Sequence, residues 1–155
     1  MRLLAVGVDY RSAPASVREA LAFEGPKGPS GLDALATTFP GNEGVILSTC
    51  NRVEIYAAGD TGNVPEADAL TDFLADFHGV AAETFSGHLV SYHDEGMIGH
   101  LFRVAASLES LVLGEGQILG QVREAFRAAK DRNVVGSILH KVFENAIRVG
   151  KKVRE

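Results

Sequence analysis

Apolar residues are arranged along the chain in two ways. Some form short strand-like runs, and others recur at intervals within longer helix-like runs. The strand-like runs are short and contain several β-branched residues, as is typical of strands. The helix-like runs repeat apolar residues every three or four positions, which places these residues on one helical face. These patterns predict strands at 3–8, 44–47, 53–56 and 88–92, and helices at about 15–21, 31–39 and 65–78.

The predicted elements follow one another in the order β-α-β-β-α-β. Residues 25–31 contain three glycines and two prolines and predict a loop between the first two helical pieces. The order is typical of a ferredoxin-like α+β fold, in which helices cover one face of an antiparallel sheet. We therefore expect such a core over residues 1–94.

Beyond residue 94 the pattern changes to amphipathic helices alone. The periodicity predicts helices at 94–108, 117–130 and 134–155. The last of these reaches the final residue without a stop signal, so we expect the natural polypeptide to continue. Residues 95–155 are accordingly predicted to form a helical extension that completes the domain and begins a connecting helix.

Composition limits the location and the kinds of site. The chain is 46% apolar, and it lacks both the run of about 18 apolar residues that a membrane span needs and a signal-peptide pattern. We therefore expect a cytoplasmic protein with no membrane partner. One cysteine excludes an intrachain disulfide and a cysteine-based metal cluster, and the histidines lack metal-ligand spacing.

The charge is unevenly distributed. The net charge is −5, which argues against a nucleic-acid partner, yet residues 121–155 hold nine Lys and Arg against four Asp and Glu. This basic segment fits either contact with an RNA backbone or the solvated face of amphipathic helices.

The single cysteine, Cys50, lies in a polar cluster between two predicted strands. A lone cysteine is often a small buried residue without chemistry. Here Thr49, Asn51 and Arg52 flank it, and a cation beside a thiol favours the nucleophilic thiolate. Cys50 is therefore a candidate nucleophile, and Arg52 a candidate carboxylate-binding group.

Three segments, residues 48–56, 100–105 and 110–122, closely resemble glutamyl-tRNA reductase, and residues 4–14 resemble the start of that family. The resemblance implies a catalytic domain whose cysteine attacks the ester of glutamyl-tRNA to form a glutamyl thioester. NADPH then reduces the thioester to glutamate-1-semialdehyde for tetrapyrrole and haem synthesis. The resemblance places the NADPH-binding and dimerisation domains outside this chain, so this chain is expected to bind no cofactor and to be monomeric.

The resemblance also assigns roles to individual residues. It implies that Arg52 holds the substrate carboxylate, that Glu115 holds the ammonium group, and that His100 acts as a base or orienting group. The residues alone allow a plainer interpretation than the resemblance does. Glu115 would be a residue at a helix start, Ser110 a helix cap and His100 a core histidine. The glycine spacing at 114–120 is not a dinucleotide fingerprint, and Gly116 stands where the family usually has proline. The resulting catalytic set is Cys50 and His100, and the substrate-binding set is Thr49, Asn51, Arg52, Ser110, Glu115, Gly116, Gln117 and Gln121.

Two other functions remain open. A stand-alone chain that forms a thioester without reducing it would act as a thiol esterase on glutamyl-tRNA. A binding module would instead hold tRNA, haem or a partner enzyme without using Cys50. The resemblance adds glutamate-1-semialdehyde aminomutase as a candidate partner.

Overall fold

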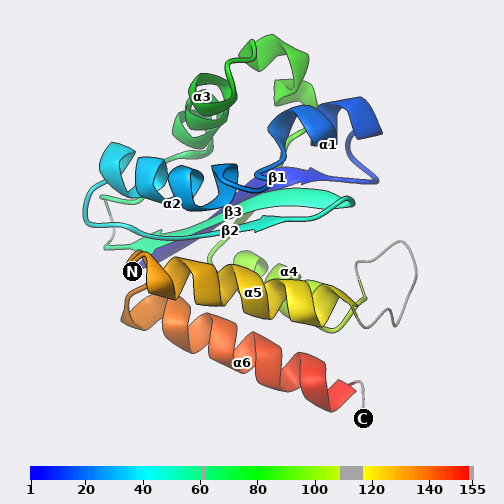
Figure 1. The fold of residues 1–155 in the computed structure, drawn as a ribbon. Helices are drawn as coiled ribbons and strands as arrows, with labels where there is room; N and C mark the ends of the chain where they lie inside the picture. Colours follow the sequence, from blue (N-terminus) through cyan, green and yellow to red (C-terminus); the bar gives the residue numbers. More distant parts are fainter. Residues whose placement is uncertain (61, 109–116, 154–155) are drawn as a thin grey trace.

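A four-stranded antiparallel sheet lies between two layers of helices (Figure 1). The computed structural model describes residues 1–60, 62–108 and 117–153. Every pair of neighbouring strands in the sheet is antiparallel, in the order β2-β3-β1-β4. The predicted α+β class with an antiparallel sheet is confirmed. The strands are β1 (Arg2–Asp9), β2 (Glu43–Ser48), β3 (Arg52–Gly59) and β4 (Val90–His93).

Helices cover both faces of the sheet, whereas the sequence predicts cover on one face only. The first three helices lie on one side and the last three on the other (Figure 1). The reason is that all of β3 and nearly all of β1 are buried, so both faces of the central strands require apolar cover. The helices are α1 (Ala15–Leu21), α2 (Lys27–Thr38), α3 (Ala67–His78), α4 (Glu95–Ala105), α5 (Gln117–Asp131) and α6 (Ser137–Val153).

Alternate residues of β3 face the two helical layers. Tyr56 packs edge-on against Phe143 of α6, with ring centroids 5.4 Å apart. Because side chains alternate along a strand, Ile55 faces the opposite layer. Residues of α4, α5 and α6 thus share one apolar core with residues of the first 94 positions.

The prediction of a loop over residues 25–31 is wrong, because α2 already begins at Lys27. Pro29 lies in the first helical turn, where the backbone N–H would have no intrahelical acceptor, so proline is tolerated there. The fourth strand begins later than predicted, at Val90, because Ser86–His88 forms a 3₁₀ turn. The other predicted elements are present with shifted ends.

A carboxylate at the start of β2 fixes the beginning of α6. The two carboxylate oxygens of Glu43 accept hydrogen bonds from the backbone N–H groups of Gly136, Ile138 and Leu139 at 2.7–3.2 Å. Gly136 directly precedes α6 and the other two lie in its first turn, where the N–H groups have no intrahelical acceptors. Next to Glu43, Gly44 N–H donates to the carbonyl oxygen of Val134 at 2.8 Å. The sheet edge therefore sets the position of α6.

Candidate active site

Cys50 lies at the tip of the tight turn that joins β2 to β3, and it is exposed. Thr49 N–H donates to the Arg52 carbonyl oxygen at 2.8 Å, and the Thr49 hydroxyl accepts from the N–H groups of Asn51 and Arg52. From outside the turn, Arg18 Nε donates to the Cys50 carbonyl oxygen at 3.2 Å. The backbone of Cys50 is thus held on both sides while its thiol remains accessible.

A small pocket of about 30 Å³ adjoins Cys50. Its lining comes from the turn and from the first residues of α5, which are more than 60 positions apart in the sequence. Six of the residues predicted from the sequence meet there. The lining residues are Thr49, Cys50, Asn51, Arg52, Gln117, Ile118 and Gln121.

Three other predicted substrate-binding residues, Ser110, Glu115 and Gly116, lie outside the described residues. They precede α5 directly in the sequence.

Behind the pocket, a buried polar cluster surrounds the carboxylate of Glu54. Arg52 Nη1 lies 3.2 Å and His100 Nε2 lies 2.6 Å from Glu54 Oε2. The Tyr56 hydroxyl donates to Glu54 Oε1 at 2.7 Å. Glu54 therefore joins the strand that carries the pocket to a histidine on α4.

The protonation of this cluster follows from its surroundings. Burial opposes ionisation of Glu54, but the hydrogen bond and charge of His100, together with the charge of Arg52, outweigh it and lower the pKa of Glu54. Burial and the adjacent Glu54 carboxylate raise the pKa of Tyr56 well above its usual value. Glu54 is therefore the anion of the cluster and Tyr56 stays a neutral hydrogen-bond donor.

His100 is fully buried, so it lies behind the pocket and not at its surface. Its ring stacks on Tyr92 of β4, with centroids 3.9 Å apart and planes 9° from parallel. Its Nδ1 has no hydrogen-bond partner among the described residues. Among the described residues, His100 is connected to the pocket through Glu54 and Arg52.

Sequence reasoning did not single out Glu54, Tyr56, Tyr92 or Arg18. One signal was available for the first two, because Arg52, Glu54 and Tyr56 alternate along a strand whose other positions are apolar. A period of two puts three such polar groups on one face. No local pattern identifies Tyr92 or Arg18, whose contacts are to residues distant in sequence.

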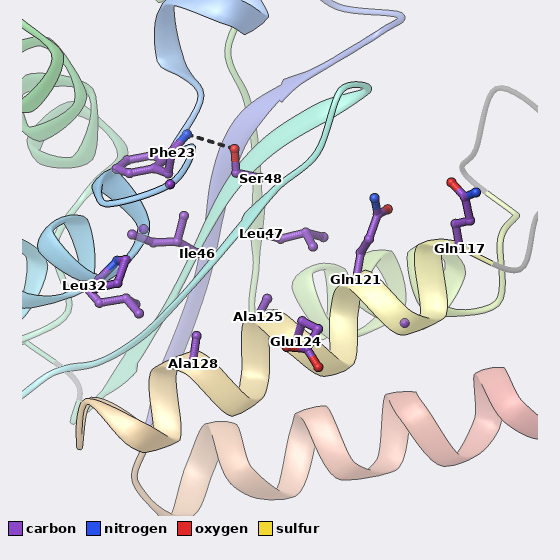
Figure 2. A pocket seen from close by; sticks show the side chains of 14 residues that line it. Phe23, Leu32, Ile46, Leu47, Ser48, Gln117, Gln121, Glu124, Ala125 and Ala128 are labelled. Carbon is purple, nitrogen blue, oxygen red and sulfur yellow. Dashed lines mark hydrogen bonds between the residues drawn. The ribbon is translucent and has the colours of Figure 1, made fainter.

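A much larger groove, of about 900 Å³, lies beside the small pocket. One wall comes from α5, the other from α2 and the segment before it, and β2 lies between them (Figure 2). Gln117 and Gln121 line both the groove and the small pocket.

Comparison with known proteins identifies the family. Residues 6–155 match the family model described as the N-terminal domain of glutamyl-tRNA(Glu) reductase. This chain belongs to the glutamyl-tRNA reductase family.

Individual members of the family agree with this match. Glutamyl-tRNA reductases of Pseudoalteromonas atlantica and Frankia alni are 44% and 45% identical to this chain over 99% and 98% of its length. The solved glutamyl-tRNA reductase of Methanopyrus kandleri matches 98% of the chain at 30% identity with a TM-score of 0.78. The chain spans 36%, 32% and 34% of these three relatives, about a third of each.

No helix in the described parts of the chain is both long enough and apolar enough to span a membrane. Within residues 1–60, 62–108 and 117–153, no three His, Cys, Asp or Glu side chains gather where they could hold a metal ion.

Proposed function

We propose that this chain is the thioester-forming domain of a glutamyl-tRNA reductase, with Cys50 as the nucleophile. The observation that carries the proposal is an exposed thiol on a turn whose backbone is hydrogen-bonded on both sides, beside a pocket lined by Gln117 and Gln121. Pre-organisation of this kind lowers the entropic cost of bringing a nucleophile to its substrate.

In the proposed step, the Cys50 thiolate attacks the carbonyl carbon of the ester that joins glutamate to tRNA. The carbon–sulfur bond forms, the bond to the ribose oxygen breaks, and that oxygen takes up a proton as tRNA leaves. A thiolate suits this role because it is strongly nucleophilic near neutral pH and its acyl product stays reactive. In the complete enzyme, NADPH supplies the hydride that converts the thioester to glutamate-1-semialdehyde.

For substrate selection, we assign the glutamyl carboxylate to Arg52, which lines the pocket and whose guanidinium carries several donors. Glu54 neutralises and orients that guanidinium from behind, at 3.2 Å. Because His100 contacts Glu54 and is buried, we infer that it is a positioning residue. Thr49, Asn51, Gln117 and Gln121 complete the described part of the pocket, and we assign Ser110, Glu115 and Gly116 to the same site.

Several features of the complete protein remain proposals. We infer a ferredoxin-like arrangement for the sheet, supported by its strand order and antiparallel pairing. We assign NADPH binding and dimerisation to the part of the family outside this match. A cytoplasmic location, a monomeric state for this chain and an aminomutase partner stay predictions.

The test is incubation of the chain with glutamyl-tRNA labelled on the amino acid, followed by intact mass measurement in mild acid. An adduct of glutamyl mass that localises to Cys50 and disappears in Cys50→Ser supports the proposal. Binding of the tRNA without an adduct favours a binding module and overturns it.

Thiol esterase activity is the second candidate, because the exposed position of Cys50 leaves a thioester open to water. Steady release of glutamate by the native chain, lost in Cys50→Ser, would establish this activity in the absence of reduction.

A further inference from the structure

The groove beside Cys50 runs along the outer edge of β2 for most of the length of α5. Its α5 residues extend from Gln117 to Ala128, about 16 Å at the usual helical rise. Along β2, Ile46 faces Phe23 and Leu32, whereas Leu47 faces α5 (Figure 2). It is a long channel with a largely apolar interior, and its Gln117 end opens at the Cys50 pocket.

The edge strand supplies backbone groups to this channel. Gly44 N–H points away from β3, since it donates to Val134, and alternation along the strand turns the N–H and C=O of Ile46 the same way. Within the described part of the chain, the Ile46 backbone has no hydrogen-bond partner on this outer side. The channel therefore combines apolar surface with the outward backbone N–H and C=O of Ile46 and the side-chain amides of Gln117 and Gln121.

The charged groups at the channel are already compensated by neighbouring cations. Glu124, in the lining, pairs with Arg127 at 3.0 Å. Arg132 of the segment after α5 pairs with Asp33 of α2 at 3.1 Å, close to Leu32 at the end of the channel far from Cys50. A polyanionic ligand in the channel would thus not face uncompensated carboxylates at these positions.

We propose that this channel binds the unpaired 3′-terminal nucleotides of glutamyl-tRNA. The inference rests on the proposed role of Cys50, because an ester at that thiol places the terminal ribose directly beside it. The pocket at Cys50 has only about 30 Å³, so the nucleotides must occupy adjoining space, and the channel of about 900 Å³ shares Gln117 and Gln121 with that pocket.

The chemistry of the channel suits unpaired bases. Proteins bind single-stranded RNA by stacking its bases on aromatic or apolar surface and by hydrogen bonding to base edges. Pro29, Ala125 and Ala128 supply accessible apolar surface, while Gln121 and the Ile46 backbone supply donors and acceptors. A peptide strand could also pair with an edge strand, but it would not account for the continuity with Cys50.

Two glycines in the channel walls allow it to be filled without disturbing the rest of the protein. A Cβ atom built on Gly120 of α5 meets no atom within 4 Å, and one on Gly28 of α2 meets only the Phe23 carbonyl oxygen at 3.9 Å. Neither glycine lines the Cys50 pocket. Gly96 of α4 is an exposed helical glycine with equally open surroundings, outside the channel, and serves as the matched control.

The experiment compares acylation of Cys50 by two substrates, glutamyl-tRNA and a small α-thioester of glutamate that lacks nucleotides. Gly120→Phe and Gly28→Phe are expected to slow acylation by glutamyl-tRNA at least about tenfold, the order of effect expected from losing the stacking of one base. Acylation by the small thioester should keep its rate, and Gly96→Phe should leave both rates unchanged. Thermal unfolding shows whether each variant is folded. If one of the two blocking variants does not fold, the other still tests the proposal.

The outcomes separate this proposal from the function on which it rests. If the native chain is acylated by both substrates and neither blocking variant slows the reaction with glutamyl-tRNA, the channel proposal is overturned while the role of Cys50 stands. Equal slowing with both substrates also overturns it, because the substitution would then act on the thiol pocket. If the native chain is acylated by neither substrate, the proposed role of Cys50 is refuted, and the channel assignment is refuted with it.

Discussion

Nε2 of His100 lies 2.6 Å from Oε2 of Glu54, although 46 positions separate the two residues in the sequence. Both side chains are buried, and Glu54 also pairs with the equally buried Arg52, which lines the Cys50 pocket. A carboxylate taken out of water is tolerated only when cations and donors surround it. Glu54 is therefore the residue through which α4 and the pocket depend on each other.

Replacement of Glu54 by glutamine should destabilise the fold strongly. The variant removes the buried negative charge that pairs with Arg52 and His100, and loss of one partner from a buried ion pair costs about 3–5 kcal/mol. The free energy of unfolding in urea measures the loss. Glu66→Gln is the matched control, because Glu66 pairs with Arg2 at a similar 3.3 Å but is largely exposed, where such pairs contribute about 0–1 kcal/mol. Equal losses in the two variants would contradict the role given to Glu54.

The stability of the protein should fall as the pH is lowered from 7 to 5, in part because of His78. Burial and the charge of Lys27 lower the pKa of His78 from 6.5 to about 4. Between these values the unfolded chain binds a proton that the folded chain does not, so stability present above pH 6.5 is lost toward pH 4.

His78→Phe should reduce this pH dependence. Phenylalanine keeps a ring against Phe23 and Phe77, whose centroids lie 4.6 and 5.0 Å from that of His78, but it does not titrate. Urea unfolding at pH 7 and pH 5 gives the difference. His140→Phe, at an exposed position of α6, is the control for the change of side chain. An unchanged slope in His78→Phe would show that other groups cause it.

Removal of the Glu43 carboxylate should loosen α6. Its oxygens accept from three N–H groups at the start of α6, and loss of a single helix cap costs about 0.5–2 kcal/mol. We expect Glu43→Ala to cost at least about 2 kcal/mol, because three partly buried donors lose their acceptor. Thermal and urea unfolding measure it, with Glu144→Ala on the exposed face of α6 as the control. A cost no greater than that of the control would argue against the capping role.

Gly7 of β1 should tolerate no side chain. A Cβ atom built there would collide with the Val53 carbonyl oxygen and would lie 2.9 Å from Glu54 Cγ. Overpacking of a core typically costs about 1–3 kcal/mol, and a clash with backbone in the centre of the sheet should place Gly7→Ala at or above about 3 kcal/mol. Gly87→Ala, where a Cβ meets nothing within 4 Å, should be close to neutral. Similar soluble yield and melting temperature for the two variants would refute this expectation.

Local sequence patterns predicted the features that depend on neighbouring residues. The apolar runs predicted four strands, and apolar residues repeated every three or four positions predicted the amphipathic α5 and α6. Thr49, Cys50, Asn51 and Arg52 adjoin one another in the sequence, so their presence at one turn required no knowledge of the fold. The prolines at 26 and 29 led to the wrong prediction of a loop at 25–31. Proline disrupts the interior of a helix, but it is tolerated in the first turn, where these two residues lie or which they precede.

Only the tertiary structure decided which distant residues meet. The sheet is buried on both faces, and this brings α5 across β2 so that Gln117 and Gln121 lie beside Cys50. It also sets His100 against Glu54 and shapes the channel between α2 and α5. Periodicity tells which side of an element is apolar, but not which other element covers it. That choice follows from packing of the whole core and from the requirement that every buried charge find its partner.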